Sequence, residues 1–219
     1  MGKELIYLLA SKGKPELEGS EWECIFANCI GARWKPSNVG LDDVVMGNTA
    51  WGAKTVKAQK PSEQKRIRLI SGRNSPTYSF EEKIATNADP NLIGSLVFDI
   101  WNERVSSIRE KYKHLRTVVL ITSNTLSEVA VFEFETIRYD NELYRWEWNK
   151  NKNLIGIDKR TETHKFTWQP HGSQFTIIEE VPSKTLIIRI KQPEPLNKEL
   201  ILTALGFEKS WITVLKKNG

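Results

Sequence analysis

Two aspartates and a lysine stand on either side of a short turn in the first quarter of the chain. Asp42 and Asp43 open one apolar segment, and Lys54 lies in the next. The Gly47–Asn48 dipeptide between the two segments predicts a β-hairpin. Since side chains alternate along a strand, an aspartate and the lysine can share one face of that hairpin.

Carboxylates beside a lysine are the groups that metal-assisted hydrolysis of a phosphodiester needs. Carboxylate oxygens bind a hard cation such as Mg²⁺, and an ammonium group positions a water molecule or stabilises charge on a phosphate. The same residues also have structural readings, because aspartates commonly enter turns and lysines commonly face solvent. The spacing of the two aspartates and the lysine, taken together, favours a catalytic site.

The stretch resembles the PD-(D/E)XK nuclease superfamily, and the organisation of all 219 residues resembles that of a type II restriction endonuclease. In that family a helix carrying a glutamate precedes an aspartate-bearing strand, and this strand pairs with one that carries acid-x-lysine. The resemblance implies Asp42 as the metal-binding aspartate and Lys54 as the catalytic lysine. It implies Glu23 or Glu21 as the helix acid, with Asp42 and Glu23 as ligands of Mg²⁺. Gly52 departs from the pattern, because it stands where the second acid is expected.

Two ways around this departure remain open. A neighbouring element can supply the missing carboxylate, the candidates being Glu23, Glu63, Glu81 and Glu82. Alternatively Asp43 works with Lys57, in which case Thr55 occupies the acid position. Glu23 has a structural reading as well, since Ser20 to Glu23 has the Ser-x-x-Glu form of a capping box.

Positive charge is concentrated in residues 51–75, which hold seven basic residues against one acid, Glu63. The whole chain has a formal net charge of +5, so the remainder is close to neutral. The basic cluster can be explained as a solvated face of the protein. Its concentration on predicted strands, however, favours nucleic acid as a partner. The side chains expected to contact DNA here are Lys60, Lys65, Arg66, Arg68, Arg73 and Asn74.

Two polar loops in the C-terminal half have side chains that suit DNA recognition. Residues 149–153 and 167–174 contain asparagine and glutamine, which pair bidentately with adenine, and lysine, which pairs with guanine. Both segments also fit ordinary hairpin turns. We expect Gln169, His171 and Gln174 to contact DNA. The histidines lack the cysteine and histidine partners of a zinc site.

The hydrophobic pattern predicts helices and strands in the order helix, strands, helix, strands. Helices are expected over 21–30, 90–114 and 197–205. Strands are expected over 42–46, 50–58 and 66–72, which would form a meander, and then over 117–121, 129–134, 143–148, 154–157, 165–168, 174–178 and 186–190. The predicted fold class is α/β, with a mixed sheet core flanked by helices and an added antiparallel β section in the C-terminal half.

Length and composition fit one globular nuclease domain over residues 1–219. Its catalytic core would span about 20–135 and its β-rich DNA-recognition section about 136–192. Cys24 and Cys29 stand at helical spacing and do not make a disulfide framework, which indicates a reducing compartment. With no uncharged stretch long enough to span a bilayer, we expect a cytoplasmic protein without membrane contact.

Together these features predict a Mg²⁺-dependent, sequence-specific endonuclease that cuts double-stranded DNA. A homodimer is expected, because two-fold symmetry is the simplest way to cut both strands of a symmetric site. No nucleotide cofactor is expected, since the glycine-rich phosphate-binding motifs are missing from the sequence. Two alternatives are a repair or recombination nuclease that recognises DNA structure and a non-catalytic nucleic-acid-binding module in which Gly52 marks a dead site.

Overall fold

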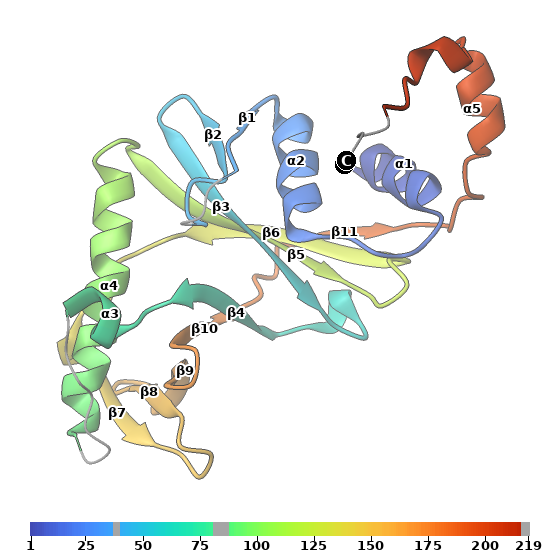
Figure 1. Cartoon of the computed structure of the whole chain (residues 1–219). Helices are drawn as coiled ribbons and strands as arrows, with labels where there is room; N and C mark the ends of the chain where they lie inside the picture. The colour runs from blue at the N-terminus through green and yellow to red at the C-terminus, as the bar shows by residue number, and fades with distance from the viewer. Residues whose placement is uncertain (37–39, 81–87, 216–219) are drawn as a thin grey trace.

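The computed structural model describes residues 1–36, 40–80 and 88–215 of the chain. Two of the candidate acids, Glu81 and Glu82, therefore lie outside the described residues. The predicted fold class is confirmed, because a six-stranded mixed sheet and a separate five-stranded antiparallel sheet pack together with several helices (Figure 1).

The six-stranded sheet carries the predicted hairpin. Its strand order is β1-β2-β3-β5-β6-β11, and only β3 and β5 run parallel among these neighbours. The β5 strand is buried along most of its length, which is typical of a strand covered on both faces. The strands are β1 (Arg33–Trp34), β2 (Val44–Met46), β3 (Thr49–Lys57), β5 (His114–Thr122), β6 (Glu128–Glu135) and β11 (Leu186–Arg189).

The five-stranded sheet has the order β4-β10-β9-β8-β7. Its strands are β4 (Arg66–Arg73), β7 (Tyr144–Trp148), β8 (Leu154–Asp158), β9 (Thr163–Gln169) and β10 (Gln174–Glu180). The expected meander of 42–72 is wrong at its third strand, since β4 pairs with β10 while β5 occupies the edge of β3. The β11 strand, which the sequence placed in the antiparallel section, also belongs to the other sheet.

The helices lie on different sides of the two sheets. In Figure 1, α1 (Gly2–Lys12) and α2 (Gly19–Ile30) lie on one side of the six-stranded sheet, and the β4–β10 layer lies on the other. The long α4 (Pro90–Arg109) connects the layers at one end, preceded by the short α3 (Pro76–Phe80). The sequence missed α1, and the α5 helix (Lys198–Ala204) extends away from the sheets. No helix in the described ranges is both long and apolar enough to cross a bilayer.

An aromatic cluster holds α4 against the five-stranded sheet. Phe98 of α4 has its ring centroid 4.9 Å from that of Phe166 and 5.1 Å from that of Trp146. Gly94 lets α4 lie close to Trp146, because a Cβ at position 94 would lie 2.2 Å from the Trp146 ring. On the other side, Ile67 and Leu69 of β4 pack against the six-stranded sheet. The β4 strand is therefore held by its pairing with β10 in one sheet and by hydrophobic packing against the other.

Candidate active site

Asp43 lies immediately before β2 and is buried, with 2% of its surface exposed. Its Oδ2 accepts a hydrogen bond from the backbone N–H of Ala53 at 2.9 Å. Burial raises the pKa of Asp43 to about 6, although the Ala53 hydrogen bond and the Lys54 charge oppose the rise. The charges of Glu23 and Asp42 act in the same direction as burial.

Lys54 lies on β3, close enough to Asp43 for their charges to interact. Burial lowers the pKa of the Lys54 ammonium group, while the negative charge of Asp43 opposes this shift. Arg104 of α4 lowers that pKa further, and Glu23 raises it. Four charged side chains from different parts of the chain thus share one electrostatic environment. Burial shifts the pKa values of three of them, Asp43, Lys54 and Arg104, toward the neutral forms, as is typical of functional sites.

Glu23 is the helix acid of this cluster. The capping box predicted for Ser20 and Glu23 is wrong, because the helix begins at Gly19 and the box is formed by Glu18 and Glu21. Glu21 is occupied further by Lys12, whose Nζ lies 2.8 Å from both of its carboxylate oxygens. Glu23 instead accepts a hydrogen bond from Trp34 Nε1 at 3.0 Å, which orients its carboxylate beside β1.

Asp42 takes a different role from the one that the resemblance implied. Its buried carboxylate forms an ion pair with Lys35, which follows β1. The sequence offered two pairs, Asp42 with Lys54 or Asp43 with Lys57. The structure instead brings Asp43 close to Lys54. Lys57 is exposed and, three residues after Lys54, lies on the opposite face of β3. Its charge contributes to the lowered pKa of Glu16, well outside the Asp43 cluster.

Gly52 leaves no room for the missing acid. A Cβ at this position would lie 2.8 Å from the carbonyl oxygen of Gly40 and 3.2 Å from the Cα of Leu41. Backbone thus occupies the space that a carboxylate side chain would need. Glu63 does not replace the acid either, because it forms an ion pair with Lys60 at the surface.

The carboxylates around Asp43 offer few ligands for the divalent cation that the resemblance implies. Among the described residues, no three His, Cys, Asp or Glu side chains are grouped so that they could hold a metal ion. Mg²⁺ usually keeps several waters and takes one or two protein carboxylates together with phosphate oxygens. Asp43 and Glu23 fit such a shared site, in which the substrate completes the coordination. Asp42 does not fit it, since Lys35 already neutralises its charge.

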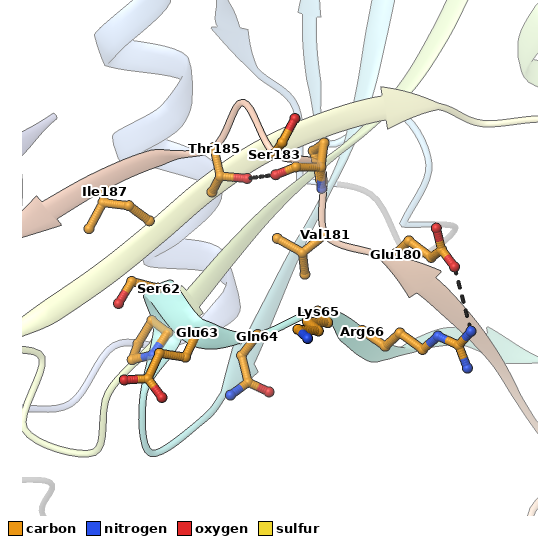
Figure 2. Close-up of a pocket in the computed structure, with 12 residues that line it drawn as sticks. Ser62, Glu63, Gln64, Lys65, Arg66, Glu180, Val181, Ser183, Thr185 and Ile187 are labelled. Atoms are coloured by element: carbon orange, nitrogen blue, oxygen red, sulfur yellow. Dashed lines mark hydrogen bonds and ion pairs between the residues drawn. The ribbon is translucent and has the colours of Figure 1, made fainter.

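The predicted phosphate contacts form two groups along β4. Lys65 and Arg66 line a cleft of about 860 Å³ between the start of β4 and the β10–β11 connection (Figure 2). Arg66 faces Glu180 there at 3.6 Å, and Lys60 is paired with Glu63 nearby. Arg68 and Arg73 follow along the same strand and are exposed, although Arg68 also donates to Thr167 Oγ1 at 3.2 Å.

Asn74 is wrong as a DNA contact, because it is completely buried. Its Nδ2 donates to the carbonyl of Val97 at 3.0 Å, and its Oδ1 accepts from Arg104 Nη1 at 3.2 Å. Its own carbonyl accepts from Trp168 Nε1 at 2.7 Å. Sequence reasoning missed Arg104, although its spacing from Trp101 and Ile108 placed it within the apolar row of α4.

The two polar loops come together at one end of the five-stranded sheet. Residues of 149–153 and 170–173 line a common cleft of about 630 Å³ with Ser75, Pro76 and Thr77. His171 is part of that lining. Gln174 pairs in register with both Gln169 and Arg73, so these three residues form a row across neighbouring strands.

Searches against known protein families, curated proteins and solved structures find no match for this chain.

Proposed function

We propose that this protein is a Mg²⁺-dependent endonuclease that cuts double-stranded DNA at specific sequences, as type II restriction enzymes do. The observation that carries the proposal is the convergence of Glu23, Asp43 and Lys54. A helix acid, a strand aspartate and a lysine on the paired strand occur here in the order that the PD-(D/E)XK resemblance implies. Asp43 is buried and Lys54 is partly buried, and both have shifted pKa values, which a purely structural role does not require.

The chemistry of the protein's own groups suits phosphodiester hydrolysis. Because its pKa is about 6, Asp43 is mostly ionised at neutral pH and can orient or deprotonate an attacking water molecule. The Lys54 ammonium group can stabilise negative charge that develops on the phosphate. When bound, Mg²⁺ would supply Lewis-acid assistance, with Asp43 and Glu23 as its protein ligands. The exposed basic residues of β4 would hold neighbouring phosphates.

Two copies acting together would cut both strands, and the C-terminal segment supports this part of the proposal. Every residue of α5 is at least partly exposed, Leu200 being 70% exposed, and Leu205, directly after the helix, is 63% exposed. Trp211, farther along, is 61% exposed. Apolar side chains gathered in this way commonly mark an interface, and a second copy is the partner that symmetric cleavage requires. Sedimentation equilibrium on the protein alone tests this, with a mass of twice 25.2 kDa expected.

A cleavage assay tests the function itself. The purified protein is incubated with several phage and plasmid DNAs in the presence of Mg²⁺, and the fragments are separated. Discrete bands that disappear with Lys54→Met support the proposal. Cleavage of branched DNA alone would replace it with a structure-specific nuclease. Retarded but intact DNA would replace it with a non-catalytic binding module, which the blocked position at Gly52 would then explain.

A further inference from the structure

The cleft between the two polar loops has a volume that suits a small ligand. Its volume of about 630 Å³ lies within the range of about 300–1,000 Å³ that such sites commonly have. It is bounded by the β7–β8 and β9–β10 turns and by the start of α3. The cleft is separate from the Asp43 cluster and has no part in the chemistry described above.

Aromatic surface forms one part of this cleft. Trp148 ends the edge strand β7 and is 37% exposed. Its register partner Leu154 is in turn paired with Trp168, so both indoles lie on the same face of the sheet. Trp168 is 2% exposed and is fixed by its hydrogen bond to the Asn74 carbonyl. The cleft therefore has a rigid aromatic base and an accessible indole beside it.

The polar groups around the indoles match a nucleotide. Among the described residues that line the cleft, none is acidic, and Lys152 and His171 are the cationic or protonatable ones. Asn151 and Asn153 also line it, and their backbone N–H groups are held by Asn149 Oδ1 at 2.9 Å and 3.0 Å. Carboxamides read the edge of a base, and a lysine binds phosphate. The larger cleft of Figure 2 differs, since Glu63 and Glu180 line it.

A short chain of contacts connects this cleft to the candidate active site. The backbone N–H of Asn74 donates to the carbonyl of Ser173 at 2.8 Å, and Ser173 lines the cleft. The side chain of Asn74 accepts from Arg104, whose charge acts on Lys54. The cleft and Arg104 are therefore joined through Asn74, and Arg104 is one of the charges that act on Lys54.

We propose that this cleft binds a single unstacked nucleobase of DNA, with the base against Trp148 and the adjoining phosphate at Lys152. The proposal rests on the nuclease function proposed above, because it names the part of the DNA that the loops recognise. Base–aromatic stacking is tolerant of sequence, so the asparagines rather than Trp148 would select the base.

The test compares two single-stranded pentanucleotides that differ only in whether the central residue has a base or is abasic. Binding is measured by fluorescence anisotropy without Mg²⁺. We expect Trp148→Ala to weaken binding of the complete oligonucleotide by about 5- to 150-fold, the range for loss of one base stack. Binding of the abasic oligonucleotide should be unchanged, and Trp148→Phe should restore most of the loss.

Tyr7→Ala is the control for loss of an exposed aromatic side chain, because Tyr7 lies on α1, is 68% exposed and does not line the cleft. It should leave both affinities unchanged. The proposal is overturned if Trp148→Ala binds both oligonucleotides like the wild type, or weakens both equally. If the wild type cleaves no DNA but still distinguishes the two oligonucleotides through Trp148, the nuclease function falls and the base site stands.

Discussion

The β2–β3 hairpin and the end of the five-stranded sheet both bury polar side chains, but they do so in opposite ways. In the hairpin the buried groups are charged, and burial shifts the pKa of Asp43 and of Lys54 toward the neutral forms. At the end of the five-stranded sheet the buried Asn74 side chain is neutral and uses both of its polar groups, donating to the Val97 carbonyl and accepting from Arg104. Buried charges cost stability, whereas satisfied neutral networks stabilise and rigidify. The difference supports the proposal that the hairpin carries the chemistry, while Asn74 holds the end of the five-stranded sheet in place.

Restoring the missing acid at position 52 should destabilise the hairpin and should not increase cleavage. Gly52→Asp places a side chain where the Gly40 carbonyl already lies and adds a third carboxylate near Asp43. We expect a loss of unfolding free energy on the order of 3 kcal/mol or more and no gain in cleavage. Thermal melts check this, with Gly52→Ala as the control for the Cβ alone. A stable and more active Gly52→Asp enzyme would show that the backbone yields there.

Neutralising Asp43 should stabilise the protein. Its folded pKa of about 6 lies above the unfolded value, so the folded state binds more protons between about pH 4 and 6. Stability is therefore lost as the pH rises through that window. Asp43→Asn removes this penalty, and its oxygen can still accept from Ala53 N–H. We expect a gain on the order of 2 kcal/mol at pH 8 and little at pH 4, measured by denaturant unfolding. Destabilisation at pH 8 would contradict the assigned burial cost.

A loss of stability is expected when the hydrogen bonds of Asn74 are removed. Asn74→Ala removes the side-chain donor to the Val97 carbonyl and takes one acceptor from Arg104. We expect a loss of about 2 kcal/mol in unfolding free energy that changes little between pH 5 and 8. Asn151→Ala is the exposed control on the neighbouring loop and should change stability by less than about 0.5 kcal/mol. A strong pH dependence for Asn74→Ala would place a titrating group in this network.

The smallest effects should come from the basic strand. Lys65→Ala should reduce the slope of log affinity for DNA against log salt by about one, for one lost phosphate contact. Lys60→Ala should change the slope less, because Lys60 is paired with Glu63. Affinity titrations at several salt concentrations check both. An unchanged slope with Lys65→Ala would remove this end of β4 from the DNA surface.

The sequence was sufficient where a local period decided the structure. The hairpin, α4 and the strands of the five-stranded sheet follow from alternation or helical spacing, and their bounds differ by a few residues. The partner of β4 could not be predicted, since its strand signal does not say which distant edge it will join. The α1 helix was missed because it carries only a short apolar run.

The sequence contains the information that distinguishes Asp43 from Asp42, but the prediction did not use it. The two-residue turn at Gly47–Asn48 fixes the pairing of Met46 with Thr49 and of Val44 with Trp51. Extended by one residue, this register sets Asp43 opposite Gly52, on the same face as Lys54. Asp42 then falls on the other face. The sequence could not show that Asp43 is buried or that the Gly40 backbone lies over Gly52, because both depend on tertiary packing.

Single-turnover cleavage by Asp43→Asn and Asp42→Asn tests the central claim most directly, namely that Asp43 works with Lys54. Both variants are measured with the wild type between pH 5 and 8, with melting curves alongside. We expect Asp43→Asn to lose cleavage by about two or more orders of magnitude while still folded, as when an electrostatic catalytic group is removed. Asp42→Asn should keep most of its activity, and the rate of wild-type cleavage should rise with pH through about 6, the pKa of Asp43. An active Asp43→Asn enzyme beside an inactive, folded Asp42→Asn enzyme would contradict the account.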